Sequence, residues 1–165
     1  MLRLELMFES IIDYIEEHPN TTMLELCENI NGFRGDLQWH LGQNIFIYNN
    51  CSQDAIELMI MLLKNNMIYA EIVPPSVYLK EGFVPAYPLA KSHKGRYKYP
   101  RWLPLTFSKS PSLIENWDLY PLDLSHSGWS SHCWLVRPFT LKQRLEYTGY
   151  NSEIDTIIAS KFNKI

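Results

Sequence analysis

The segment from Lys91 to Trp102, KSHKGRYKYPRW, combines cations with aromatic rings and contains no carboxylate. Cations attract anionic groups and flat rings stack on planar groups, so this composition is typical of a binding surface. The segment has one glycine, Gly95, and Pro100 fixes the local backbone, so we expect an exposed loop or hairpin. The side chains predicted to contact a partner are those of Lys91, Lys94, Arg96, Tyr97, Lys98, Tyr99, Arg101 and Trp102. A second interpretation is that these cations only neutralise the acidic N-terminal helix within the fold.

The residues from Ser125 to Cys133 include side chains that bind metals or act as nucleophiles. His126, His132 and Cys133 are candidate metal ligands, and Cys133 beside a histidine is a candidate nucleophile. Their spacing matches no common zinc pattern, and neighbouring His132 and Cys133 would point to opposite faces of a strand. We therefore favour a serine-rich turn leading into a strand and predict no metal site. A Cys133-dependent enzyme stays an alternative.

The motifs of common enzyme classes are missing from the chain. It has no glycine-rich dinucleotide or phosphate-binding motif, no zinc-protease motif and no serine-hydrolase motif. Glu16 and Glu17 fall on the polar face of a predicted helix rather than in a catalytic pair. We therefore predict a non-enzymatic protein without a cofactor.

Composition and charge describe a folded globular chain. With 165 residues, 46% apolar and 20% charged, the chain can bury one hydrophobic core. Residues 1–73 hold three cations against eleven carboxylates, and residues 74–165 hold twelve against seven, which gives −8 and +5. Three cysteines without a CxxC pair, and no signal peptide, favour a reducing, cytoplasmic location. The broken apolar pattern at the N-terminus predicts no membrane span.

The N-terminal half has clear helix signals. Apolar residues from Leu4 to Ile15 recur at helical spacing and predict a helix that ends near His18. Thr22 and Glu25 form a capping-box pattern for a second helix through residue 30. Ser52 is expected to cap a third, core helix over 53–66. Residues 36–41 fit one or two helical turns, 44–48 and 67–73 fit strands, and 77–84 fit a hairpin.

This order of elements resembles a winged-helix domain, a helix-turn-helix class in which three helices precede a β-hairpin wing. The resemblance covers about residues 4–85 and departs from the pattern in the long stretch before the third helix, 32–51. It implies that the third helix reads DNA, but that helix carries Asp54, Glu57 and a single Lys64. Because its carboxylates would repel phosphates, a protein-binding winged helix is favoured.

The sequence thus predicts an α+β protein with a winged-helix-like unit over 1–85. A Pro- and aromatic-rich part over 86–165 would hold strands at 102–107 and 134–136, then two C-terminal helices. We expect this part to pack on the first unit through Trp102, Trp129 and Trp134. The predicted function is docking on a protein or nucleoprotein partner as a regulator or inhibitor, of the kind that phages or mobile elements often encode. A DNA-binding transcriptional regulator is the main alternative.

Overall fold

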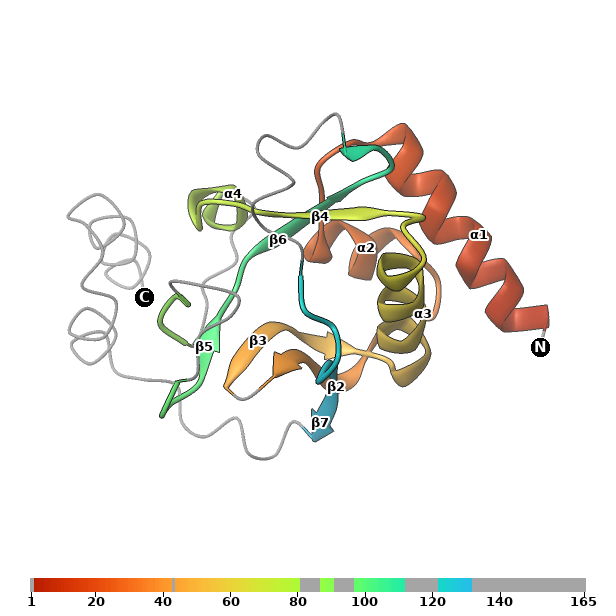
Figure 1. Cartoon of the computed structure of the whole chain (residues 1–165). Coiled ribbons are helices and arrows are strands. Elements are labelled where there is room, and N and C mark those ends of the chain that lie inside the picture. Colours follow the sequence, from red (N-terminus) through yellow and green to blue (C-terminus); the bar gives the residue numbers. More distant parts are fainter. Residues whose placement is uncertain (1, 43, 81–86, 91–96, 112–121, 132–165) are drawn as a thin grey trace, which may run out of the picture.

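The computed structural model describes residues 2–42, 44–80, 87–90, 97–111 and 122–131, which form helices and two sheets (Figure 1). The chain therefore belongs to the α+β class. Its described helices are α1 (Leu2–Glu17), α2 (Met23–Asn29), α3 (Gln53–Lys64) and α4 (Ser76–Leu79). Its described strands are β1 (Thr21–Thr22), β2 (Arg34–Gly42), β3 (Ile45–Cys51), β4 (Tyr69–Ile72), β5 (Arg101–Trp102), β6 (Leu105–Ser108) and β7 (Gly128–Ser131).

The three predicted N-terminal helices are confirmed, and two of them begin with the predicted cap. Thr22 Oγ1 accepts a hydrogen bond from Glu25 N at 3.2 Å, and the Glu25 carboxylate accepts one from Thr22 N at 2.9 Å. Ser52 Oγ accepts one from Ala55 N at 3.1 Å. Each cap satisfies backbone donors that the first helical turn leaves without an intrahelical partner.

Residues 36–41 form part of a strand, so the prediction of helical turns there was wrong. Strand β2 pairs antiparallel with β3 on one side and with β7 on the other. The turn between β2 and β3 contains Asn44 at a φ of 58°, a left-handed conformation that asparagine tolerates. Pairing with β7, almost ninety residues later in the chain, gives β2 hydrogen bonds that its local sequence does not reveal.

The predicted hairpin over 77–84 is also wrong in its first arm, because residues 76–79 form α4. Pro75 has a φ of −60° and starts this helical turn. The turn carries Tyr78 into the core, where its hydroxyl accepts a hydrogen bond from Met23 N at 2.9 Å and donates one to Leu105 O at 2.5 Å. Residues 83 and 84, the expected second arm, lie outside the described residues.

The strand predicted over 102–107 is split between the two sheets. In the first sheet, with the strand order β1-β6-β4, the middle strand β6 pairs antiparallel with both neighbours. In the second sheet, with the order β5-β3-β2-β7, strand β5 pairs parallel with β3. Pro104 lies between β5 and β6, and a proline cannot donate to a strand ladder. The expected strand at 134–136 and the C-terminal helices fall outside the described residues.

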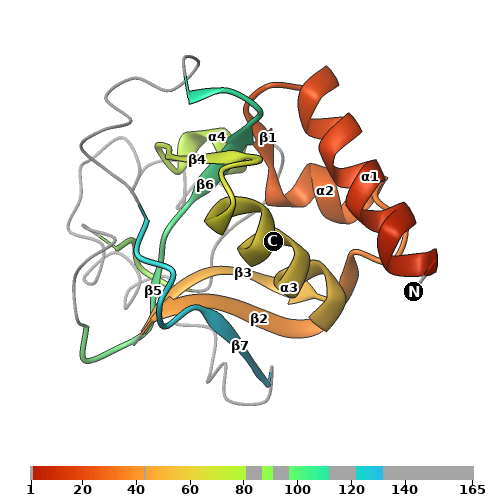
Figure 2. The ribbon, with the colours of Figure 1, turned by 45° about the vertical axis from the view of Figure 1, so that its right-hand side comes forward.

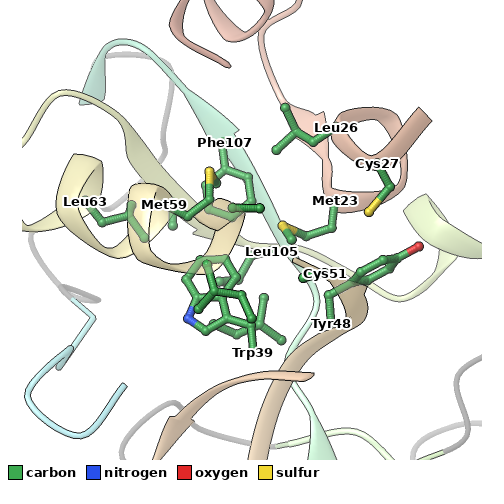
Figure 3. Packing of buried hydrophobic residues seen from close by; sticks show 14 of the residues in the cluster. Met23, Leu26, Cys27, Trp39, Tyr48, Cys51, Met59, Leu63, Leu105 and Phe107 are labelled. Carbon is green, nitrogen blue, oxygen red and sulfur yellow. The ribbon is translucent and has the colours of Figure 1, made fainter. Parts of the chain in front are cut away.

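Helix α3 lies between the two sheets, and α1 and α2 lie together at one side (Figures 1 and 2). The core joins all these elements, and Figure 3 shows Trp39, Met59 and Phe107 among its members. Trp39 and Phe107 are fully buried and stack at 6.2 Å between ring centroids. Strands from 101–108 and 128–131 thus complete sheets that begin in the first half of the chain.

Candidate binding surface

The described end of the basic-aromatic segment is residues 97–102, hereafter the anchored loop. Its last two residues form β5, an edge strand beside β3. Arg101 N donates to Asn44 O and Leu103 N donates to Phe46 O, both at 2.8 Å. The loop therefore ends in a strand that backbone hydrogen bonds hold in place. Lys91, Lys94 and Arg96, predicted to contact a partner, lie outside the described residues.

Trp102 is a core residue, which confirms its predicted packing on the first unit and corrects its predicted place on the binding surface. Its side chain is 3% exposed. Its Nε1 donates to Ile47 O at 3.1 Å, and its ring meets Tyr78 edge to face at 5.3 Å. A partner cannot reach a ring held in this way, so Trp102 supports the loop from beneath.

Two half-buried residues brace the anchored loop. The Arg101 guanidinium lies 5.0 Å from the centroid of the Tyr97 ring and donates a hydrogen bond to Leu89 O at 3.1 Å. Asn44 Nδ2 donates to Tyr97 O at 2.7 Å. A guanidinium on an aromatic face is an attractive arrangement, so these contacts favour the observed conformation of the loop.

Lys98 and Tyr99 are the exposed residues of the anchored loop. The Tyr99 side chain is 49% exposed, and Lys98 Nζ lies 5.7 Å from the centroid of its ring. Lys98 forms no ion pair with a described residue. Instead Lys109, outside the predicted set, pairs with Glu16 of α1 at 2.9 Å. The loop therefore presents one cation and one aromatic ring to solvent.

A polar cluster that the sequence reasoning missed lies on the sheet face formed by β2 and β7. Gln38 and His40 are two residues apart on β2, and Ser130 of β7 lies directly opposite Gln38, so all three share one face. Gln38 Nε2 donates to the Tyr87 hydroxyl at 3.1 Å. The buried atoms Gln38 Oε1, His40 Nδ1 and Ser130 Oγ have no hydrogen-bond partner in the described part of the chain. Alternation along β2 would have revealed this polar face had residues 36–41 been recognised as a strand.

Burial sets the charge state of this cluster. It lowers the pKa of His40, although a hydrogen bond with the backbone of Trp129 opposes the shift. It also raises the pKa of the Tyr87 hydroxyl, against a smaller opposite effect of the bond from Gln38. Both groups are therefore neutral near pH 7. The polar face of β2 and β7 can donate and accept hydrogen bonds, but these two groups add no charge to it.

Helix α3, which the winged-helix resemblance would place in a DNA groove, is packed on several sides. Arg3 of α1 pairs with Asp54 in its first turn at 2.9 Å. Its side chains that contribute to the core are Ala55, Ile56, Leu58, Met59, Leu62 and Leu63. The exposed residues are Gln53, Glu57, Met61 and Lys64, a narrow stripe with one cation. This stripe offers few contacts to phosphates or to base edges.

The remaining predicted chemistry has little structural counterpart. His126 is exposed, and His132, Cys133 and Trp134 lie outside the described residues. Trp129, which was predicted to pack on the first unit, is 39% exposed, so that prediction was wrong for this residue. Within the described ranges, no three His, Cys, Asp or Glu side chains gather as metal ligands would. The same ranges hold no helix with the length and apolar character needed to cross a membrane.

Comparisons with protein-family models, curated proteins and solved structures found no match.

Proposed function

We propose that the chain is a non-enzymatic cytoplasmic binding protein that docks on a protein or nucleoprotein partner, as a regulator or inhibitor, through the anchored loop. The observation that carries this proposal is the exposure of Lys98 and Tyr99 on a loop braced from beneath by Arg101 and Asn44. A braced loop loses little conformational entropy on binding, and an exposed aromatic ring gives rigid contact area. The partner would meet these two residues with an anionic group beside an apolar one.

Part of this proposal is that residues 1–85 form a winged-helix-like unit that binds protein. Its support is the order of α1, α2 and α3 along the chain. The strand pair β2–β3 then stands as an insertion before α3, and α4 occupies the place where the wing would begin. The narrow exposed stripe of α3 favours protein binding over DNA reading.

The test compares substitutions in the loop with a matched one on α3. The full chain, immobilised and exposed to a cell lysate, should retain a defined partner. Binding of that partner should weaken about 30-fold or more in the Lys98→Glu, Tyr99→Ala double variant, which corresponds to loss of a hot spot. Lys64→Glu, a charge reversal at an exposed lysine of α3, should leave binding unchanged. Thermal unfolding should barely differ among the three proteins, because exposed charges contribute little to stability.

Two results would contradict the proposal. If the double variant melts earlier and still binds, the loop has a structural role only. If the chain instead binds duplex DNA with an affinity that falls steeply as salt rises, and Lys64→Glu abolishes that binding, then α3 contacts phosphates and the protein reads DNA.

A further inference from the structure

Two cysteines from distant parts of the sequence meet beneath α2. Cys27 lies on α2 and Cys51 ends β3 (Figure 3). The two residues are 7% and 0% exposed. Cys27 Sγ lies 3.7 Å from Asn50 O and Cys51 Sγ lies 3.8 Å from Asn49 O. Each thiol shifts the pKa of the other, so the two groups lie close together, and both are free. The pair is therefore a reduced dithiol held across α2 and β3.

A surface cavity is lined in part by Cys27, one of the two cysteines. The cavity has a volume of about 370 Å³ and lies at the C-terminal end of α2, where the chain turns into β2. Cys27 and Arg34 line it, together with Glu28 and the turn residues 29–32, whereas Cys51 does not. A small molecule entering the cavity would therefore contact Cys27 and not Cys51.

The surroundings favour the thiolate at Cys27. The neighbouring Cys51 thiol lowers the pKa of Cys27, and Arg34 lowers it further, while burial and Glu28 oppose these effects. The Cys27 thiol and burial raise the pKa of Cys51. Tyr48 on β3 has its hydroxyl pKa raised by burial and by the two cysteines, so it is neutral. A thiolate beside a protonated thiol is the arrangement that thiol–disulfide exchange requires.

We propose that Cys27 and Cys51 form a thiol–disulfide exchange site that takes a small-molecule disulfide through the cavity lined by Arg34. The Cys27 thiolate forms a bond to one sulfur of that disulfide, whose other sulfur leaves as a thiolate. Cys51 then loses its proton to solvent and attacks the Cys27 sulfur, which releases the second small thiolate. The cysteine pair gives up two electrons to the small disulfide, which departs as two thiols. The product is a disulfide that ties α2 to β3.

The experiment uses dithiobis(nitrobenzoate), an aromatic disulfide that releases a coloured thiolate at each exchange. The starting protein is the reduced full chain with Cys133→Ser, so that only the proposed pair reacts. It should release two equivalents of coloured thiolate and end without an adduct, two hydrogens lighter by mass. With Cys51→Ser added, it should release one equivalent and keep the adduct on Cys27. With Cys27→Ser added instead, release should be about tenfold slower or more, because Cys51 does not line the cavity.

Two further measurements keep the test independent of variants that fold poorly. Peptide mapping of the oxidised wild-type chain should find the Cys27–Cys51 crosslink directly. Arg34→Gln, at an exposed position, should slow the first release about twofold without changing the melting temperature. The proposal is overturned if the two-cysteine protein keeps its adduct, if mapping finds no such crosslink, or if release occurs only in denaturant.

Discussion

His40 shows how a single titratable side chain can be tied to the stability of a sheet. It lies partly buried on β2, facing Gly128 of β7, and its ring meets Phe46 edge to face at 6.0 Å. Burial lowers its pKa from the ordinary value of 6.5. The window runs from pH 6.5, the pKa in the unfolded chain, down to the lower pKa in the folded chain. Within it, the unfolded chain binds a proton at His40 more readily than the folded chain does. Stability contributed by neutral His40 is present above that window and declines as the pH falls through it.

Substitution of His40 should therefore reduce the acid sensitivity of the fold. We expect the free energy of unfolding of the wild-type chain to fall more between about pH 7.5 and about pH 5.5 than that of His40→Gln. Urea unfolding at the two pH values, followed by tryptophan fluorescence, measures the difference. His126→Gln, at an exposed histidine, is the matched control and should lose stability on acidification as the wild type does. Equal losses in His40→Gln and wild type would contradict the assignment.

The residues of the basic-aromatic segment show what composition can and cannot predict. Its mixture of cations and rings predicted exposure, and Lys98 and Tyr99 are exposed. The same composition did not distinguish Trp102, which is buried because β5 pairs with β3 and Tyr78 packs against its ring. Those contacts join residues that are far apart in sequence, so no local pattern contains them.

The helices followed from local signals, whereas several strands did not. A cap and the spacing of apolar residues act within one or two turns, so α1, α2 and α3 could be predicted from the sequence. Strand β2 depends on β3 and on β7, and α4 is held by Tyr78 through bonds to Met23 and Leu105. The polar cluster around Gln38 was missed for a different reason, because residues 36–41 were interpreted as helical turns although polar and apolar residues alternate along them.

Ser52 links the start of α3 to the turn before β2, and its substitution tests both contacts. Its hydroxyl accepts from Ala55 N at 3.1 Å and donates to Gly32 O at 2.8 Å. We expect Ser52→Ala to lower the free energy of unfolding by about 1–2 kcal/mol, since it removes a helix cap and a second hydrogen bond. Urea unfolding measures this loss. Ser52→Asp keeps an acceptor for Ala55 but has no hydrogen for Gly32, so it should lose less. An unchanged midpoint in Ser52→Ala would show that neither contact stabilises the fold.

The whole molecule is built so that its second half completes sheets begun by its first half. Strand β6 lies between β1 and β4, pairing Thr22 with Thr106 and Ala70 with Phe107. Leu105 and Phe107 are fully buried in the common core. On the other sheet, β5 and β7 cover the two edges of the β2–β3 pair. Removal of these strands would leave four strand edges unpaired and would expose much of the core.

A fragment that ends at residue 85 should therefore not fold as the full chain does. Without β6, neither β1 nor β4 has a strand partner among the described residues, and the apolar faces of α3 and Tyr78 lose the packing of Leu105 and Phe107. Burial of such side chains stabilises a fold by about 1.5–3 kcal/mol each, so the loss of these two removes about 3–6 kcal/mol, a large part of the roughly 5–15 kcal/mol margin of a small domain. We expect residues 1–85 to show no cooperative thermal transition by circular dichroism. Limited proteolysis of the full chain should release no stable fragment ending near residue 85.

The matched control is the full chain with Lys109→Ala, which removes only the exposed ion pair to Glu16 and should melt as the wild type does. A cooperative transition of the fragment near the wild-type temperature would show instead that the first half is a domain that folds without the strands of the second.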